Sequence, residues 1–252
     1  IDGIGVAHTG YLIDAYSDKP DIDHEFWASD LEYNARRVME YHKHGIHLHF
    51  HAVGDGGVRR ATAMYEAAHA GAGDTGSRMS TEHLDMSDPA DWARMAKAGI
   101  ICSVQPQHLA LYPRFEDEEY AGVVGPIRTK NLWAFKSMLD NGIHLAFGTD
   151  FPVVTYDTRL SLHRAVTRKY PDGQPENGWN PEQKLTLWDA LYAYTYSGAY
   201  KVGKENVLGS LECGKLADIV VWDRNLFDIP ADDILNSGVA LTVCDGHIVY
   251  EG

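Results

Sequence analysis

The stretch His47-Leu-His-Phe-His-Ala-Val-Gly-Asp55 has the pattern of a strand that ends in a polar turn, and it delivers His51 to its carboxyl end. Two other segments end in the same way, Met79-Ser-Thr-Glu-His83 and Leu145-Ala-Phe-Gly-Thr-Asp150. Histidine and aspartate are residue types that hold a hydrolytic divalent metal ion. The three strand ends therefore predict a metal-dependent hydrolase with one metal ligand from each, namely His51, His83 and Asp150.

Helix and strand patterns alternate from residue 24 to residue 200. The predicted strands span residues 46–51, 79–83, 99–104 and 142–148. The predicted helices span residues 26–44, 128–140, 157–169 and 186–199, and two more begin near residues 56 and 87. This alternation is typical of a parallel sheet covered by helices, so the predicted fold class is α/β. Such proteins build their sites at the carboxyl ends of the strands.

The sequence changes character after residue 203, where short β runs replace the alternation. These runs span residues 216–223, 239–244 and 247–250, and Asp245-Gly246 is a predicted hairpin turn between the last two. We therefore predict two domains, a larger one over residues 1–203 that carries the site and a small β domain over residues 204–252.

The residues that follow the third predicted strand are candidates for substrate contact. Gln105 and His108 come directly after this strand, at the mouth of the predicted site. Residues 109–126 have no regular pattern and are predicted to form a functional loop or lid, with a solvated acidic run at Glu116-Asp-Glu-Glu119. Arg128 begins the next helix, and we expect it either to bind substrate or to pair with an acidic neighbour.

Composition excludes several classes of partner. Lys and Arg (22) against Asp and Glu (36) give a net charge of −14, which argues against nucleic acid and anionic membranes. The three cysteines are far apart and support neither a disulfide framework nor a cysteine zinc site. No apolar run approaches the roughly 18 residues of a membrane span. We expect a cytoplasmic protein with a small-molecule substrate, and a homo-oligomer is an open alternative.

Several motifs in chain order resemble the amidohydrolase superfamily, specifically the YtcJ-like branch of amidohydrolase family 3. They are His51-Ala-Val-Gly-Asp55, Glu82-His83, Ser103-Val-Gln-Pro106, Phe147-Gly-Thr-Asp-Phe-Pro-Val153 and Leu208-Gly-Ser-Leu-Glu-Cys-Gly-Lys-Leu-Ala-Asp218. The last strand pair, within Val243-Cys-Asp-Gly-His-Ile-Val-Tyr250, resembles the closing hairpin of the family. The likeness covers nearly the whole chain and rests on the motifs jointly.

The resemblance implies a (β/α)8 TIM-like barrel flanked by a small β-sandwich. In this family a His-x-His pair on the first strand, a Lys on the fourth, a His on each of the fifth and sixth and an Asp on the eighth form the metal site. By motif, His51, His83 and Asp150 match the fifth, sixth and eighth strands. The chain is therefore expected to be a fragment, the C-terminal half of the barrel (strands 5–8) plus part of the sandwich. The absent initiator Met before Ile1 agrees with this expectation.

The resemblance, which extends to N-substituted formamide deformylase, also implies the chemistry. It implies that one or two divalent metal ions activate water to hydrolyse a non-peptide carbon–nitrogen bond. Zinc is the expected metal. Asp150 acts as general base and returns the proton to the leaving amine. His83 holds the metal or the developing oxyanion.

Alternatives to this interpretation stay open. His47 and His49 share a strand face with His51, so a His-x-His pair of the first-strand type is conceivable here. However, the following Ala-Val-Gly-Asp matches the fifth strand, and His47 and His49 are then packing groups. The chain alone is also compatible with a catalytically incomplete fragment or with a non-catalytic binding module of the same fold.

Overall fold

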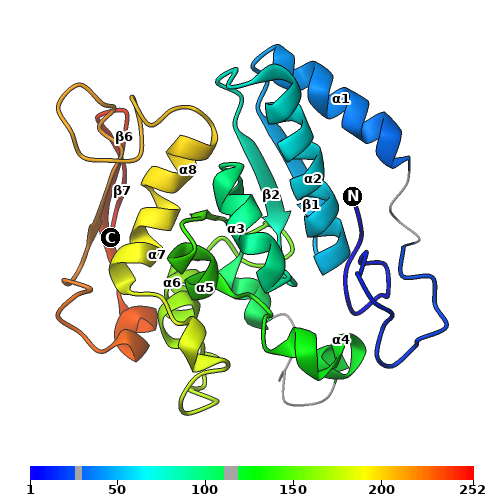
Figure 1. The fold of residues 1–252 in the computed structure, drawn as a ribbon. Helices are drawn as coiled ribbons and strands as arrows, with labels where there is room; N and C mark the ends of the chain where they lie inside the picture. Colours follow the sequence, from blue (N-terminus) through cyan, green and yellow to red (C-terminus); the bar gives the residue numbers. More distant parts are fainter. Residues whose placement is uncertain (26–29, 111–118) are drawn as a thin grey trace. The chain divides into compact units, whose positions relative to one another are not determined.

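The computed structural model describes residues 1–25, 30–110 and 119–252, which divide into two compact units (Figure 1). The first unit consists of Ile1–Val104 and Ala110–Leu145, and the second of Gln105–Leu109 and Ala146–Gly252. The predicted acidic run at residues 116–119 and the start of the predicted helix at residue 26 lie outside the residues whose side chains are described.

A four-stranded sheet, in the order β1-β2-β3-β4, confirms the α/β class. Its strands are β1 (Leu48–Ala52), β2 (Met79–His83), β3 (Ile101–Val104) and β4 (His144–Phe147). β1 runs parallel to β2 and β2 parallel to β3, with His51 opposite Glu82 and Glu82 opposite Ser103. Because parallel strands end on the same edge, the residues that follow β1, β2 and β3 share that edge.

The helices of the first unit follow the strands in alternation. They are α1 (Leu31–Lys43), α2 (Asp55–Ala72), α3 (Pro89–Lys97), α4 (Glu119–Thr129) and α5 (Phe135–Asp140). α1 packs on α2, and both contact β1 (Figure 1). α3 begins where the sequence predicts, because the Asp88 carboxylate accepts a hydrogen bond from the backbone of Ala90 and Pro89 fills the first turn.

The second unit combines helices with a small antiparallel sheet. Its helices are α6 (Thr158–Thr167), α7 (Leu187–Tyr194) and α8 (Tyr196–Lys201), and the short 3-10 helices are η1 (Pro106–Ala110), η2 (Pro181–Gln183) and η3 (Ala231–Asn236). The sheet order is β5 (Ile219–Trp222), β6 (Val239–Cys244), β7 (His247–Glu251). The predicted hairpin between β6 and β7 is confirmed, with Asp245 and Gly246 both at positive φ as its tight turn requires.

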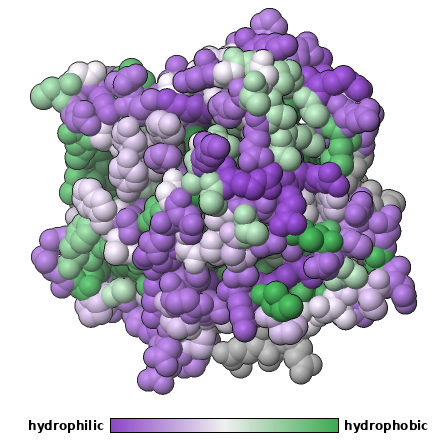
Figure 2. Space-filling view, viewed as in Figure 1, coloured by the Kyte–Doolittle hydropathy of each residue, from purple (hydrophilic) through white to green (hydrophobic). Residues whose placement is uncertain are grey.

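Apolar side chains remain exposed on this small sheet. Figure 2 shows hydrophobic atoms where Figure 1 draws β6 and β7, and Ile248 and Val249 are 60% and 61% exposed. The domain boundary predicted at residue 203 stays a prediction, since the two compact units follow a different division of the chain.

Three predicted elements differ from the structure. The stretch expected to be irregular, 109–126, contains most of α4, whose kink falls at Gly125 (φ 82) before Pro126. The helix expected over 128–140 is interrupted before α5, where Trp133 has a φ of 47. The helix expected over 186–199 breaks at Thr195 into α7 and α8. In the last two cases a single residue with an unusual backbone conformation interrupts a continuous helical pattern.

Candidate functional site

His51 lies near the end of β1, beside a buried carboxylate. Its Nδ1 is 3.5 Å from Oδ1 of Asp2, whose side chain is fully buried. Asp2 also accepts hydrogen bonds from the backbone nitrogens of Val53 and Gly54, at 2.9 and 2.8 Å. The nearby Asp2 carboxylate raises the pKa of His51 above its ordinary value. Asp2 therefore orients the ring through Nδ1, which leaves Nε2 as the atom suited to a metal.

His83, the last residue of β2, lies next to His51 within the first unit. The two ring centroids are 4.5 Å apart in an edge-on arrangement, and His83 is 8% exposed. His83 and Leu84 both have positive φ, so the chain turns sharply at the end of this strand. The turn is held by Leu84, whose backbone nitrogen donates to the carbonyl oxygen of Ala52 at 3.0 Å. The structure thus brings together two of the three predicted metal ligands.

Asp85 is a buried carboxyl group two residues beyond His83. Its Oδ2 accepts a hydrogen bond from the Tyr120 hydroxyl at 3.0 Å, and its backbone oxygen accepts one from the Trp133 nitrogen at 2.9 Å. Burial raises the pKa of Asp85 to about 7, even though Tyr120 and Trp133 favour the charged form. Sequence reasoning missed this residue, since the aromatic groups that bury it are distant in the chain.

The third predicted ligand, Asp150, lies in the second unit beside His108. The distance from Oδ2 of Asp150 to Nε2 of His108 is 3.7 Å, with 38% of the Asp150 side chain and 6% of the His108 side chain exposed. Asp150 has a φ of 60, an uncommon conformation for a residue other than glycine. Gln105, the first residue after β3, is buried. Imidazole and carboxylate groups are of the types that can bind a metal ion, and a carboxylate can also accept a proton.

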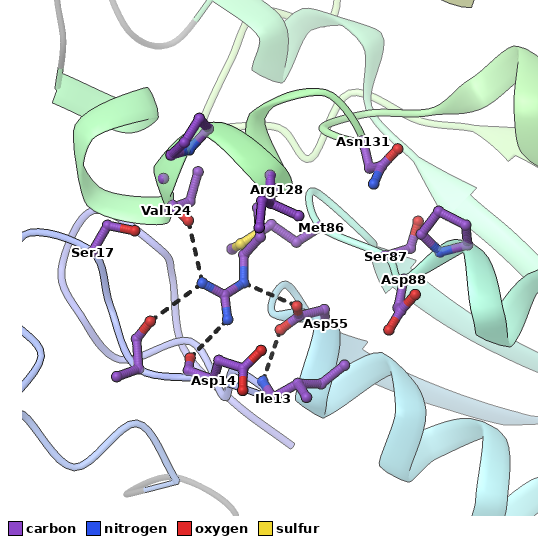
Figure 3. Close-up of a pocket in the computed structure, with 15 residues that line it drawn as sticks. Ile13, Asp14, Ser17, Asp55, Met86, Ser87, Asp88, Val124, Arg128 and Asn131 are labelled. Atoms are coloured by element: carbon purple, nitrogen blue, oxygen red, sulfur yellow. Dashed lines mark hydrogen bonds and ion pairs between the residues drawn. The ribbon is translucent and has the colours of Figure 1, made fainter.

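Arg128 forms an ion pair, one of its two predicted roles. Its Nε donates to Oδ2 of Asp55 at 2.9 Å, and its other nitrogens donate to the carbonyl oxygens of Asp14, Ala15 and Val124 (Figure 3). Asp55 itself also accepts a hydrogen bond from the backbone nitrogen of Ile13 at 2.9 Å, so it stabilises this loop. These groups line a cavity of about 520 Å³ in the first unit, shown in Figure 3.

His47 and His49 both have protein partners in the structure. His49 Nε2 lies 2.6 Å from the Glu82 carboxylate, and His49 Nδ1 lies 2.7 Å from the Ser80 hydroxyl. Nδ1 of His47 accepts a hydrogen bond from the Arg78 backbone nitrogen at 3.0 Å. Both nitrogens of His49 are therefore engaged, which favours a packing role over a first-strand metal pair.

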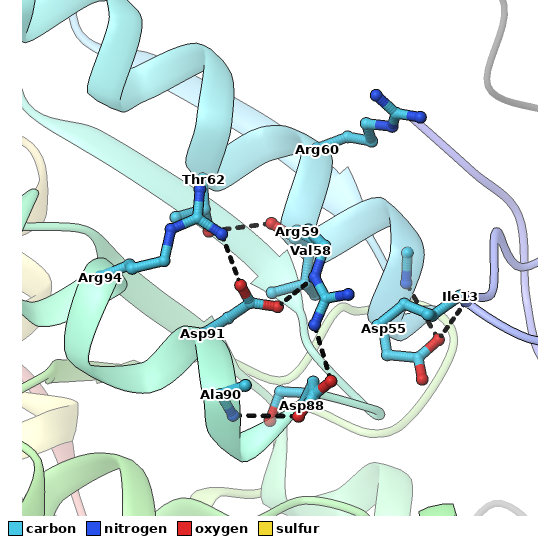
Figure 4. A network of polar contacts seen from close by, with 12 residues as sticks. Ile13, Asp55, Val58, Arg59, Arg60, Thr62, Asp88, Ala90, Asp91 and Arg94 are labelled. Atoms are coloured by element: carbon cyan, nitrogen blue, oxygen red, sulfur yellow. Dashed lines mark hydrogen bonds and ion pairs between the residues drawn. The ribbon is translucent and has the colours of Figure 1, made fainter.

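A polar network supports the segment between β2 and α3. The buried carboxylate of Asp91 accepts hydrogen bonds from Arg59 at 2.8 Å and from Arg94 at 2.6 Å (Figure 4). Arg59 also donates to Asp88 at 2.6 Å. Asp91 therefore joins α2 to α3.

Comparison with known proteins identifies the family. A model described as "Amidohydrolase family" matches residues 2–250. The chain belongs to the amidohydrolase family. The relatives N-substituted formamide deformylase of Arthrobacter pascens and the putative amidohydrolase YtcJ of Bacillus subtilis place it in family 3. They are 29% and 27% identical over 83% and 99% of the chain, which covers 37% and 46% of their lengths.

The amidohydrolase chain is also similar to two further proteins, and both similarities agree with the family assignment. It is 31% identical over 99% of its length to the protein LONG AFTER FAR-RED 3 of Arabidopsis thaliana, of which it covers 42%. A solved metal-dependent hydrolase from Pyrococcus horikoshii superposes with a TM-score of 0.71 at 26% identity, over 85% of this chain and 41% of that one. The chain thus spans less than half the length of these relatives.

In the described part of the amidohydrolase chain, no helix combines the length and apolarity needed to cross a membrane.

Proposed function

We propose that this chain belongs to a metal-dependent hydrolase that cleaves a non-peptide carbon–nitrogen bond of a small molecule. The observation that carries the proposal is the Asp150 carboxylate beside His108, at 3.7 Å, in a chain of the amidohydrolase family. The bond type follows from the relative named N-substituted formamide deformylase. Because the chain covers less than half of that relative, the activity belongs to the whole protein.

A divalent metal, zinc in the first instance, would be held by His51, His83 and Asp150. The donor set fits, since two imidazoles and one carboxylate are ordinary zinc ligands. His51 fits for a second reason, because Asp2 occupies its Nδ1 side and fixes the ring as carboxylates do for metal-binding histidines. When bound, a divalent ion would supply Lewis acidity that lowers the pKa of water towards neutrality.

The residues of this chain would then move the proton. Asp150, whose carboxylate is partly exposed, would accept it from the attacking water and return it to the leaving nitrogen. His83 would hold the metal or stabilise negative charge on the carbonyl oxygen. Gln105 and His108 contact the substrate, whereas Arg128, with its partners in the chain, contributes by holding the loop that it contacts.

The four-stranded sheet is proposed to be part of a (β/α)8 barrel, strands 5–8, with β5–β7 as part of a β-sandwich. On this proposal the His-x-His pair and the Lys lie outside the present 252 residues. The same proposal includes a cytoplasmic location and one or two metal ions per site, with a homo-oligomer as an open alternative. An incomplete fragment or a binding module of the same fold is the competing hypothesis.

Substitution of Asp150 by Asn in the complete enzyme tests the proton-transfer role. We expect turnover of an N-substituted formamide to fall by at least 100-fold, because a general base contributes about 10²–10⁴. Much of the bound metal should stay, since the amide oxygen still reaches it. Steady-state kinetics and elemental analysis of the same preparation measure both, and turnover retained by the variant would refute the assignment.

A further inference from the structure

A buried glutamine side chain ties the loop after β3 to the loop after β4. Gln107, in η1, is 6% exposed, and its side-chain nitrogen has three acceptors in the second unit. It lies 3.1 Å from the carbonyl oxygen of Thr155, 3.1 Å from that of Asp157 and 2.9 Å from the hydroxyl of Ser161. Ser161 is fully buried. These acceptors lie at the end of the β4–α6 loop and in the first turn of α6.

The same loop begins with Asp150 in a strained conformation. A non-glycine residue with φ near 60 costs free energy, and it persists only where the surrounding structure holds it. Inside the loop, the backbone nitrogen of Val153 donates to the carbonyl oxygen of Asp150 at 2.8 Å. The Asp157 carboxylate caps α6 through the Arg159 nitrogen at 3.0 Å. The Gln107 amide adds the contacts that join this loop to η1.

We propose that Gln107 is a positioning residue for Asp150. Its amide fixes the far end of the β4–α6 loop, so that the near end holds the Asp150 carboxylate beside His108. His108 is the next residue to Gln107, so one turn of η1 both anchors the loop and supplies the imidazole that faces the carboxylate. The value of this position to catalysis rests on the proposed function.

An amide suits this position because of its hydrogen-bonding chemistry. It offers two N–H donors to a set of oxygen acceptors, and it carries no charge at any working pH. A carboxylate in its place would have no N–H to donate to the carbonyl oxygens of Thr155 and Asp157. The positioning should therefore depend on donors at residue 107 and not on the volume of the side chain.

The test uses Gln107→Met, which keeps the length of the side chain and removes its donors. Hydrogen exchange resolved to single amides is measured on the 252-residue chain without metal. We expect the Val153 amide, which bonds directly to Asp150, to exchange at least 10-fold faster than in the unsubstituted chain. With zinc added, we expect affinity to fall about 10-fold, the scale seen when the partner of a metal ligand is lost.

Two further variants separate positioning from general destabilisation. Gln107→Glu, of the same shape but without donors, should reproduce the faster exchange at Val153. Thr186→Ala removes the hydroxyl that caps α7, elsewhere in the second unit, through its bond to the Asp189 nitrogen. It should lower the stability of this unit and leave Val153 exchange and zinc affinity unchanged.

Unchanged exchange at Val153 in Gln107→Met would overturn the inference, whether or not zinc binds. Faster exchange with unchanged zinc affinity would also overturn it, because the loop would then move without consequence for Asp150. If the unsubstituted chain binds no zinc, the proposed metal site fails, and the exchange at Val153 alone decides whether Gln107 holds the Asp150 segment.

Discussion

Individual carboxylates in the first unit differ in role because their partners differ. Asp2 is fully buried, yet it accepts hydrogen bonds from backbone nitrogens and faces His51, so its charge has compensation. Asp85 is buried with an aromatic hydroxyl as its side-chain donor, and desolvation raises its pKa to about 7. The protonation of Asp85 is therefore set by its buried environment and not by residue type alone.

The raised pKa of Asp85 predicts a pH-dependent stability. Its folded-state pKa of about 7 exceeds the ordinary value of 3.8. The contribution of Asp85 to the free energy of unfolding is therefore fully present below pH 3.8 and is lost as the pH rises through 7. Asp85→Asn removes this titration. Relative to the variant, the unsubstituted chain should therefore lose up to about 1.4 kcal/mol of its free energy of unfolding for each pH unit between pH 4 and pH 7.

Urea unfolding followed by circular dichroism at pH 5, 6 and 7 measures this difference. Parallel stability curves for the two chains over this range would show that Asp85 is ionised throughout and would contradict the burial argument. The absolute offset between the curves is not part of the prediction, because Asn also changes the hydrogen bond to Tyr120.

At the scale of elements, the β1–α2 turn is shaped by close backbone approach. Gly54 has an extended backbone, but a methyl group on it would overlap the carbonyl oxygen of Tyr11. That carbonyl oxygen in turn accepts a hydrogen bond from the Gly57 nitrogen at 3.0 Å. The glycine thus lets the N-terminal segment lie against the turn that follows His51.

Gly54→Ala should therefore lower the free energy of unfolding by roughly 1–3 kcal/mol, the usual cost of overpacking. Gly198→Ala, within α8, is the matched control, because a methyl there meets no atom within 4 Å. It should raise the free energy of unfolding by about 0.5–1 kcal/mol through helix propensity. Denaturant titration of both variants measures these changes. Equal changes of the same sign in the free energy of unfolding would contradict the close approach at Gly54.

The accuracy of the predictions also differs between elements. The sequence pattern located the ends of β1, β2 and β3 to within two residues, and the Asp-Gly hairpin was confirmed. Helix ends set by a single residue with an unusual conformation, such as Trp133 or Thr195, could not be predicted, because the helical pattern continues across them.

Contacts between distant residues were the least predictable part of the site. The strand ends identified His51 and His83 as neighbours, and their rings are in contact. No local pattern connects Asp2 to His51, 49 positions away, or Tyr120 to Asp85. Gln107 had one available signal, its place between Gln105 and His108, but its acceptors lie about 50 residues further along the chain.

For the molecule as a whole, the family assignment and the local geometry support one functional account. The chain matches the amidohydrolase family over residues 2–250, and it spans less than half the length of its curated relatives. We predict that His51, His83 and Asp150 hold a metal ion even without the ligands proposed to lie outside these 252 residues. A binding module that had lost its chemistry would have no need of such an ion.

Metal content of the purified 252-residue chain tests this account most directly. After dialysis against zinc-free buffer and titration with zinc, elemental analysis should find at least one ion per chain, and replacing both His51 and His83 by Asn should abolish it. A chain that retains no zinc, or a double variant that retains as much as the unsubstituted chain, would contradict the account.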